Sequence, residues 1–377
     1  MDRTEPLPET VFDAARLTVR LDAIRANYRQ CQRLGGPAAV AGVVKANGYG
    51  LGAGAVTRAL TEAGCDAFFV ARIEEGIALR PLAPEARIFV LDGAPFASVP
   101  ALISHRLTPV LNSLAEIANW REAARDARAS FDTALHIDTG MNRLGLPPEE
   151  LGVLAREAKT RLEGLRLVMT MSHLACADDP ASKMNAIQRD RFRSALAMLP
   201  PSPASLSSSG GILLGRDYLF DMVRPGIGLY GGNPQPGKPN PFAVTAQLTG
   251  KILQLRRVDR GESVGYGASF RVERPTALAT VALGYADGLM RAIGNRGKAA
   301  IAGKSVPIAG RVSMDLISLD VTEIPERHLS VGADVEFLGD AISLDQMAAA
   351  ANTAPYEILT SLGARITRHY TDEALTR

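Results

Sequence analysis

The sequence predicts an N-terminal (β/α)8 barrel of the TIM type followed by a mostly-β domain, and three observations support this prediction. Short apolar runs recur about every 25 to 35 residues through the first part of the chain. Most of these runs are followed by a stretch with helical spacing. After a proline-rich segment the pattern changes to β-rich runs separated by turns. Alternating strands and helices indicate a parallel sheet, and eight repeats indicate a closed barrel.

The eight predicted strands occupy, in chain order, residues 41–46, 67–72, 87–93, 107–112, 133–140, 167–173, 204–210 and 222–231. Helical spacing is clear in SLAEIANWREAARDA (113–127) and in AIQRDRFRSALAML (186–199). Polar residues stand at the ends of six runs, namely Lys45, Arg72, Asp138, His173, Ser209 and Arg224. Strand ends of a barrel meet at one mouth, so we expect these side chains to share one site.

The domain boundary is predicted in GGNPQPGKPNPF (231–242), which holds four prolines and three glycines. We therefore assign 20–232 to the barrel and 233–377 to the second domain, with 1–19 contributing a strand to it. The later β-rich runs are 244–258, 276–285, 298–310, 315–322 and 334–339, which suggest a small β-barrel. Ser343 and Gln346 form a capping box before a helix, and Pro355 can begin a further helix carrying Tyr356.

Composition narrows the class of protein. The chain has 377 residues, 46% hydrophobic and 22% charged, which is ordinary for a globular protein of two domains. A formal net charge of +2 provides no basic field for nucleic acid. The cysteines are far apart and form no CxxC pair, which disfavours a disulfide framework and a zinc site; they are Cys31, Cys65 and Cys176. We see no signal peptide and no apolar run of roughly 18 residues, and therefore expect a cytoplasmic protein without a membrane span.

Lys45 is the first candidate catalytic residue. It lies in VVKANGYG (43–50), at the end of an apolar run and before a glycine-rich turn. A lysine at the mouth of a buried strand can have a lowered pKa and form a Schiff base with a carbonyl, which suggests pyridoxal phosphate chemistry. The plain alternative is a lysine that reaches solvent.

A dinucleotide site is a second alternative for the same segment. Gly50, Gly52 and Ala55 fit G-x-G-x-x-A, and Glu74 and Glu75 follow roughly 20 residues later. This pattern is short and common. The eightfold repeat favours a barrel over a nucleotide-binding sheet, and the glycines suit a tight turn after a strand equally well.

Six motifs together resemble the alanine racemases, which are fold-type III pyridoxal phosphate enzymes. They occur in the order of that family over nearly the whole chain: VVKANGYG, DTGMNRLG (138–145), MVRPGIGLYG (222–231), VGYGASF (264–270), GYADG (284–288) and GRVSMD (310–315). None of the motifs is sufficient alone, but the set is very specific.

The resemblance implies a binding site for pyridoxal 5'-phosphate. Lys45 is then the Schiff-base lysine, and His173 stacks over the cofactor. Arg224 faces the pyridine nitrogen and keeps it unprotonated, because a guanidinium holds its proton at ordinary pH; the weaker electron sink favours racemisation. The implied phosphate ligands are Tyr49, Ser209, Tyr356 and the backbone amides of Gly226 and Ile227.

The resemblance also implies two bases on opposite faces of the substrate, Lys45 and Tyr266, with the tyrosine supplied by the second subunit of a homodimer. Arg143 and the amide of Met314 would bind the substrate carboxylate. Tyr285 would restrict substrate size at the entrance.

The chain departs from the family at four positions. His136 stands where many members have a carbamylated lysine that steadies the arginine. An anion such as chloride, held between Arg143 and Asn142 or His136, is a candidate substitute for that lysine. Leu51 replaces a common histidine. Ser208 and Ser313 replace a frequent asparagine and a frequent cysteine.

The leading hypothesis is an alanine racemase that supplies D-alanine for cell-wall peptidoglycan. A racemase acting on serine or on basic amino acids is the nearest alternative. A pyridoxal decarboxylase of the same fold type would need a carboxylate in place of Arg224. A non-catalytic pyridoxal phosphate carrier would lack the second domain, which here carries Tyr266 and Met314.

Overall fold

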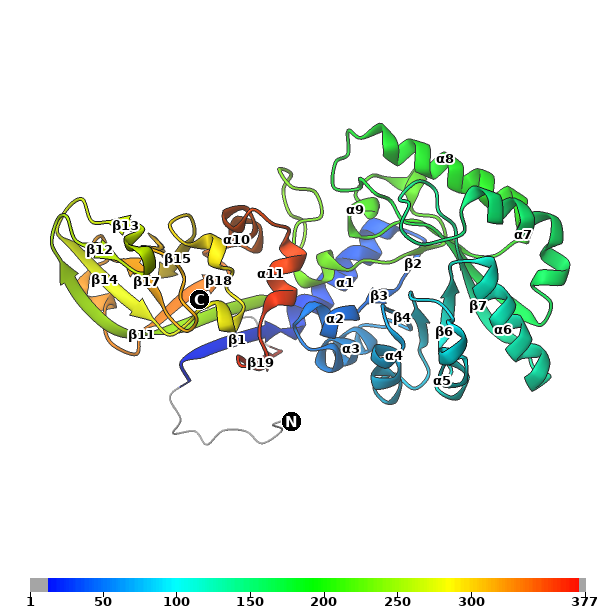
Figure 1. Cartoon of the computed structure of the whole chain (residues 1–377), viewed down its shortest axis with the longest axis horizontal. Coiled ribbons are helices and arrows are strands. Elements are labelled where there is room, and N and C mark those ends of the chain that lie inside the picture. Colours follow the sequence, from blue (N-terminus) through cyan, green and yellow to red (C-terminus); the bar gives the residue numbers. More distant parts are fainter. Residues whose placement is uncertain (1–12, 373–377) are drawn as a thin grey trace. The chain divides into compact units, whose positions relative to one another are not determined.

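The computed structural model describes residues 13–372, and they form two compact units (Figure 1). One unit comprises 21–243 with 372, and the other comprises 13–20 with 244–371. The predicted N-terminal strand (1–19) and the segment in which a signal peptide would stand fall partly on 1–12, which lie outside the described residues.

The first unit is a closed parallel barrel. Its strand segments run in the order β2-β10-β9-β8-β7-β6-β5-β4-β3. Only Ala41 separates β2 from β3, and the amide of Ala41 donates to the carbonyl of Val223 at 2.9 Å, so the two segments act as one strand and the nine make an eight-stranded barrel. The predicted (β/α)8 fold is confirmed. The segments are β2 (Ala39–Val40), β3 (Gly42–Val43), β4 (Ala67–Val70), β5 (Arg87–Val90), β6 (Thr108–Leu111), β7 (Phe131–His136), β8 (Leu165–Met171), β9 (Ala204–Ser205) and β10 (Met222–Val223).

Helices surround these strands (Figure 1). Both helices expected from spacing are present as α6 and α8, and the hydroxyl of Ser113 caps α6 by accepting from the amide of Glu116 at 3.2 Å. The strands are buried because helices cover them outside and side chains fill the barrel inside. The helices are α1 (Leu21–Gly35), α2 (Lys45–Tyr49), α3 (Ala53–Glu62), α4 (Ile73–Leu79), α5 (Val99–Ser104), α6 (Leu114–Ala127), α7 (Pro148–Arg161), α8 (Lys183–Met198) and α9 (Ser209–Ile212), with the 3₁₀ helix η4 (Ile227–Tyr230) after β10.

The proline-rich segment 233–243 groups with the barrel unit. Proline lacks an amide donor, and side-chain amides hold much of this segment instead. The amide of Ala243 donates to Oδ1 of Asn27 at 2.7 Å, and Nδ2 of Asn27 donates to the carbonyl of Leu229 at 3.2 Å. The second unit therefore resumes at Val244.

The second unit is a small β-barrel built around the long strand β11. A bulge between Ile252 and Gln254 lets β11 pair with β18 in its first half and with β14 in its second. The ring of strands closes where the amide of Ala309 donates to the carbonyl of Ser318 at 2.8 Å. The strands are β1 (Ala15–Arg20), β11 (Ala246–Val258), β12 (Ser263–Val264), β13 (Phe270–Arg271), β14 (Thr276–Val281), β15 (Lys298–Ile301), β16 (Lys304–Pro307), β17 (Ile317–Asp320), β18 (Asp334–Leu338) and β19 (Thr367–Thr371).

Two helices complete this unit, as predicted. The hydroxyl of Ser343 accepts from the amide of Gln346 at 3.1 Å and the side chain of Gln346 accepts from the amide of Ser343 at 2.9 Å, so the capping box before α10 (Leu344–Ala351) is confirmed. Pro355 begins α11 (Pro355–Ser361), which carries Tyr356.

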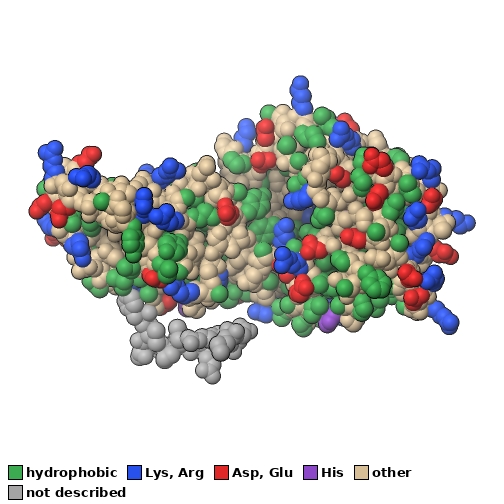
Figure 2. Space-filling model, viewed as in Figure 1, with side chains coloured by type: hydrophobic (Ala, Val, Ile, Leu, Met, Phe, Trp, Pro, Cys, Tyr) green, Lys and Arg blue, Asp and Glu red, His purple; other side chains and the backbone are tan. Residues whose placement is uncertain are grey.

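The surface carries charges of both signs. Figure 2 shows Lys and Arg interspersed with Asp and Glu over the visible face, in keeping with the small net charge. Within 13–372 there is no helix with the length and apolar character that a membrane crossing requires.

Candidate active site

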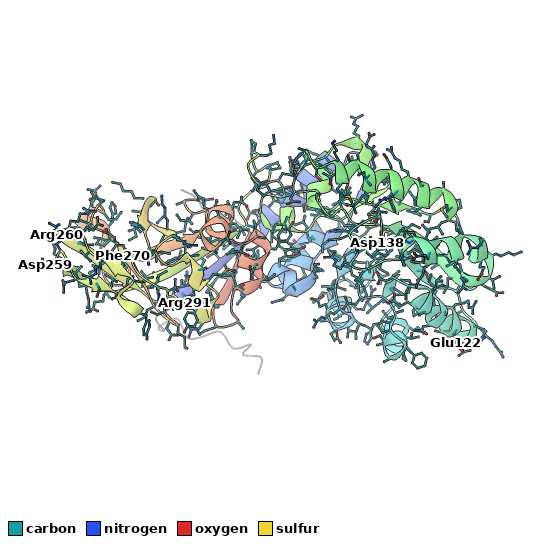
Figure 3. The ribbon with its side chains drawn as sticks, turned by 45° about the horizontal axis from the view of Figure 1, so that its top comes forward. Glu122, Asp138, Asp259, Arg260, Phe270 and Arg291 are labelled. Carbon is teal, nitrogen blue, oxygen red and sulfur yellow. The ribbon has the colours of Figure 1, made fainter. Side chains whose placement is uncertain are left out.

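Six polar residues follow the carboxyl ends of barrel strands, where the sequence placed them. Lys45 follows β3, Arg72 follows β4, and Asp138, labelled in Figure 3, follows β7. His173, Ser209 and Arg224 follow β8, β9 and β10. These ends meet at one mouth of the barrel, which is where barrel enzymes place their chemistry.

Lys45 begins a turn with unusual backbone geometry. Five successive residues are left-handed, with φ of 52° at Ala46, 54° at Asn47, 60° at Gly48, 53° at Tyr49 and 82° at Gly50. Each non-glycine residue in this conformation costs roughly 1–2 kcal/mol, so the turn needs contacts that hold it. Burial, and secondly the charge of Arg143, lower the pKa of Lys45. Both effects make the Lys45 ammonium easier to deprotonate.

A compact set of donors lies beside this turn. The hydroxyl oxygen of Ser209 accepts from the amides of Gly226 and Gly228 at 3.0 and 3.1 Å. A Cβ built on Gly226 would lie only 2.2 Å from the hydroxyl oxygen of Tyr49. Ile227 begins η4, where an amide has no acceptor within its own helix. The structure thus brings together Tyr49, Ser209 and the start of η4 in a cradle that requires glycine.

Arg224 lies in the barrel interior, 4% exposed. Its guanidinium donates to the hydroxyl of Ser205, to the carbonyl of Ser172 at 2.7 Å and to that of Leu206 at 3.4 Å. Burial lowers the pKa of Arg224 to about 9, so the group remains charged near neutral pH. Its hydrogen-bond acceptors are uncharged carbonyls and a hydroxyl, which do not neutralise the guanidinium. The positive charge of Arg224 therefore lowers the pKa of nearby basic groups.

Two histidines beside Arg224 are neutral. Burial, followed by the charge of Arg224, lowers the pKa of His136 to about 4 and that of His173 to about 3. Arg143 and Lys45 also act on the pKa of His173, which places all of these groups in one electrostatic environment.

Asn112 fixes the tautomer of His136. Nδ2 of Asn112 donates to the carbonyls of Leu91 and Val110 at 3.1 and 2.9 Å, so its Oδ1 must be the atom that lies 2.8 Å from Nδ1 of His136. The proton is therefore on Nδ1, and Nε2 carries a lone pair. A histidine in this state accepts a hydrogen bond at Nε2, which does not favour an anion at that atom.

Arg143 lies on the loop between β7 and α7. One oxygen of Asp138 accepts from the amides of Gly140, Met141 and Asn142 at 2.9, 3.0 and 3.2 Å and so shapes the loop. The Arg143 side chain is exposed, and it has no hydrogen bond or ion pair to any residue of 13–372. Its guanidinium donors are therefore available to a ligand.

Four further predicted residues lie in the second unit, and all are exposed: Tyr266 is 70% exposed, Met314 53%, Tyr356 45% and Tyr285 43%. The structure brings two of them together. The amide of Tyr285 donates to the carbonyl of Ser313 at 3.0 Å, and that of Ala286 to the carbonyl of Met314 at 2.9 Å. Tyr266 lies in a separate 3₁₀ turn between β12 and β13, the hairpin that also carries Phe270 in Figure 3.

Sequence reasoning missed the residues that support these motifs. Asp287 accepts from the amide of Gly284 at 2.8 Å, and Arg365 bridges Asp287 and Asp315, each at 2.7 Å. Asp287 lies in GYADG and Asp315 lies in GRVSMD, so their place in these motifs was the signal that could have identified them. Asn112 and Arg365 lie outside any motif, and no pattern in the sequence marks them.

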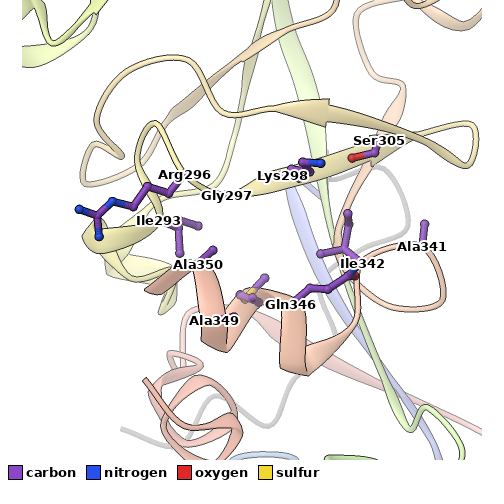
Figure 4. Close-up of a pocket in the computed structure, with 11 residues that line it drawn as sticks. Ile293, Arg296, Gly297, Lys298, Ser305, Ala341, Ile342, Gln346, Ala349 and Ala350 are labelled. Carbon is purple, nitrogen blue, oxygen red and sulfur yellow. The ribbon is translucent and has the colours of Figure 1, made fainter. Parts of the chain in front are cut away.

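A cavity of about 460 Å³ lies elsewhere, in the second unit between β15 and α10 (Figure 4). Its wall includes Ile293, Ile342 and Met347, with Arg296 and Lys298 as charged residues. It contains no carboxylate or histidine and none of the predicted site residues, so it offers no acid–base pair. No cluster of residues suited to a metal ion occurs in 13–372.

Comparison with known proteins agrees with this geometry. Residues 19–234 match the family model described as alanine racemase, N-terminal domain, and 245–370 match alanine racemase, C-terminal domain. The chain is 49% identical to an alanine racemase of Rhodospirillum rubrum, covering 94% of this chain and 96% of the relative. It is 47% identical to a catabolic alanine racemase of Mesorhizobium japonicum, with 97% and 95% covered.

Solved structures give the same result. The chain is similar to alanine racemase from Bartonella henselae with covalently bound pyridoxal phosphate, with a TM-score of 0.91, 39% identity, and 95% of this chain and 99% of that chain covered. It is also similar to the biosynthetic alanine racemase from Pseudomonas aeruginosa, with a TM-score of 0.88, 35% identity and the same coverage.

Proposed function

The chain belongs to the alanine racemase family and is an amino-acid racemase, and from that premise we propose that it binds pyridoxal 5'-phosphate and interconverts L-alanine and D-alanine with Lys45 and Tyr266 as the two acid–base groups. The proposal depends most on the set of groups at the mouth of the barrel. There a half-buried lysine with a lowered pKa lies in one electrostatic environment with a buried arginine and two neutral histidines.

The residues present fit the cofactor. The cradle of Tyr49, Ser209 and the amides of Gly226 and Ile227 is proposed to bind the phosphate. The amide of Gly226 now donates to the Ser209 hydroxyl at 3.0 Å, and a Cβ on Gly226 would collide with the Tyr49 hydroxyl, so these groups lie close together and a phosphate would replace the bond between Gly226 and Ser209. Tyr356 of the second unit is proposed as a further phosphate ligand. When bound, pyridoxal phosphate supplies the aldehyde that captures an amine and the ring that stabilises negative charge at Cα.

Arg224 is proposed to face the ring nitrogen. A charged guanidinium donates a hydrogen bond and provides no proton, so that nitrogen stays unprotonated. His173 is proposed to pack over the ring as a neutral imidazole, which suits a pKa of about 3. The site then withdraws electrons from Cα only moderately, which favours return of the proton to Cα over other outcomes.

Lys45 and Tyr266 are proposed to exchange the Cα proton on opposite faces, because one base cannot efficiently serve both. The lowered pKa of Lys45 makes its ammonium easier to deprotonate, which the proposed role of Nζ as a base requires. Arg143 and the amide of Met314 would hold the substrate carboxylate, and Tyr285, placed beside Met314, would limit the size of its side chain.

A homodimer is proposed as the working form. Tyr266 is 70% exposed on its own chain, and the family resemblance assigns it to the site of a second subunit. Soluble oligomers are most often symmetric dimers, and that symmetry would give two equivalent shared sites. The D-alanine produced would serve cell-wall peptide. Similar chains carry both catabolic and biosynthetic designations, so either direction of use is compatible with this fold.

Isotope exchange tests the proposed substrate. Purified protein loaded with cofactor and incubated in D2O with single L-amino acids is expected to exchange the Cα proton of alanine and to form the D isomer. NMR follows the loss of the proton and chiral chromatography follows the isomer. Exchange with serine, lysine or ornithine at the same rate would replace alanine with a broader substrate range. Absence of exchange with every amino acid would favour a cofactor carrier.

Gly226→Ala tests the cradle. We expect the dissociation constant of pyridoxal phosphate to rise by about tenfold or more, because the new Cβ would lie 2.2 Å from the Tyr49 hydroxyl and displace it. The fluorescence titration of apo-protein measures this. Gly152→Ala on α7 is the matched control, because its Cβ meets only the end of the flexible Arg156 side chain at 3.6 Å. Equal affinities in the two variants would place the phosphate elsewhere.

A further inference from the structure

The turn that begins at Lys45 is held at the amide of Ala46 by the carboxylate of Glu75. Oε1 of Glu75 accepts from the amide of Ala46 at 2.6 Å. Oε2 accepts from the amides of Ala71 and Arg72 at 2.9 and 3.2 Å. Glu75 lies in the first turn of α4, so it joins the end of β4 and the start of α4 to the residue directly after Lys45. Charge-assisted hydrogen bonds of this kind are stronger than neutral ones.

A buried phenol holds the other side of Lys45. Tyr230 is 2% exposed, and its hydroxyl donates to the carbonyl of Val43 at 2.9 Å, two residues before Lys45. Its ring stacks on that of Tyr49, with 4.5 Å between the centroids and 23° between the planes. Tyr230 ends η4, the helix that begins with Ile227. One side chain therefore supports both the strand before Lys45 and the tyrosine of the cradle.

We propose that Glu75 and Tyr230 are positioning residues that clamp the Lys45 turn, Glu75 at the amide of Ala46 and Tyr230 at the carbonyl of Val43. The inference rests on the proposed cofactor site and deepens it. The left-handed backbone from Ala46 to Tyr49 is strained by itself, and the two contacts come from different parts of the barrel. Together they set where the Lys45 amine and the Tyr49 hydroxyl lie before the cofactor arrives.

Glu75 is charged and Tyr230 is neutral, so the two contacts have different effects on the pKa of Lys45. This difference allows an experiment to tell a positioning role from a general loss of stability. Glu75 raises the pKa of Lys45, against the larger effects of burial and Arg143 that lower it. Asp92 also raises the pKa of Lys45, and neutral His173 lies in the same environment. Burial raises the pKa of Tyr230 well above 10, so its phenol stays neutral and carries no charge to Lys45 at ordinary pH.

Glu75→Gln is the first test. We expect pyridoxal phosphate to bind apo-protein about tenfold more weakly, because an amide cannot accept from all three backbone donors. The rate of cofactor attachment depends on the neutral amine, and removing the carboxylate lowers the pKa of Lys45. The midpoint of the rate against pH should therefore move to lower pH. Glu74→Gln is the matched control on the same helix: Glu74 is exposed and does not act on the pKa of Lys45.

Tyr230→Phe is the second test. It keeps the stacked ring and leaves the Val43 carbonyl without its donor, so we expect about fivefold weaker cofactor binding. The midpoint of the attachment rate against pH should stay at the wild-type value. Tyr218→Phe, in the same unit, is the control. Thermal unfolding of each variant shows whether the fold is retained.

The outcomes are distinct. Weaker binding in both variants with a shifted midpoint in Glu75→Gln alone supports the clamp. Wild-type affinity in both variants, or a wild-type midpoint in Glu75→Gln, contradicts it. If the wild-type protein binds no pyridoxal phosphate at all, the proposed function fails, and this inference fails with it.

Discussion

Lys45→Ala is expected to abolish the visible absorbance of the bound cofactor and to reduce alanine racemisation on the order of 10⁴-fold or more. Removing one general base costs roughly 10²–10⁴-fold, and Lys45 is also proposed to supply the covalent attachment, so the loss should reach or exceed the upper end of that range. The measurement is the absorption spectrum together with the rate of D-alanine formation by the purified, cofactor-loaded protein.

A control variant and a rescue experiment test whether the loss is specific to the Lys45 amine. Lys159→Ala removes an exposed lysine of α7 and should leave the spectrum and the rate unchanged. Methylamine added to the Lys45→Ala variant should restore part of the exchange of the Cα proton, because a free amine can enter the space of the lost side chain and act as a base. A Lys45→Ala protein that keeps both the absorbance and the rate would place the chemistry at another residue.

The expectation for Lys45 could be drawn from sequence because it depends on local pattern. Buried parallel strands read as apolar runs, and the residue after such a run is placed at the barrel mouth by the topology alone. Lys45, His173 and Arg224 were located in this way. The boundary near 233 was harder, because proline and glycine show where regular structure stops without showing which unit the chain then packs against.

The contacts that set the charge state and position of the site residues join parts of the chain that are far apart in sequence. Asn112 and His136 are 24 residues apart, Ala46 and Glu75 are 29 apart, and Val43 and Tyr230 are 187 apart. No local pattern connects such pairs. The same holds for the neutral state of His136, which follows from burial, from Arg224 and from the orientation of the Asn112 amide. The sequence therefore placed the candidate groups at the barrel mouth, and only the folded chain gives their environments.

Tyr266→Phe is expected to impair proton exchange on one face of the substrate Cα much more than on the other. The variant should keep the visible absorbance of the cofactor, because Lys45 is intact. Conversion of L-alanine should fall by roughly 10²–10⁴-fold, because phenylalanine cannot accept or donate the proton. Exchange of the Cα proton of D-alanine in D2O should fall much less, since Lys45 is proposed to serve that face. Tyr370→Phe, on an exposed tyrosine of β19, is the control. Equal losses from both isomers would contradict this division between Tyr266 and Lys45.

Mixing the two inactive variants tests whether each site uses two chains. If Tyr266 serves the partner's Lys45, a hybrid dimer of Lys45→Ala and Tyr266→Phe has one site with both bases and one site with neither. Random exchange of equal amounts gives hybrids as half of the dimers, so activity should recover to about one quarter of wild type. If Tyr266 instead serves the Lys45 of its own chain, every site in every dimer lacks one base, and mixing should restore nothing. A residue that contributes to the site of a partner must be exposed on its own chain, as Tyr266 is. The fraction of activity recovered on mixing measures whether Tyr266 contributes in this way.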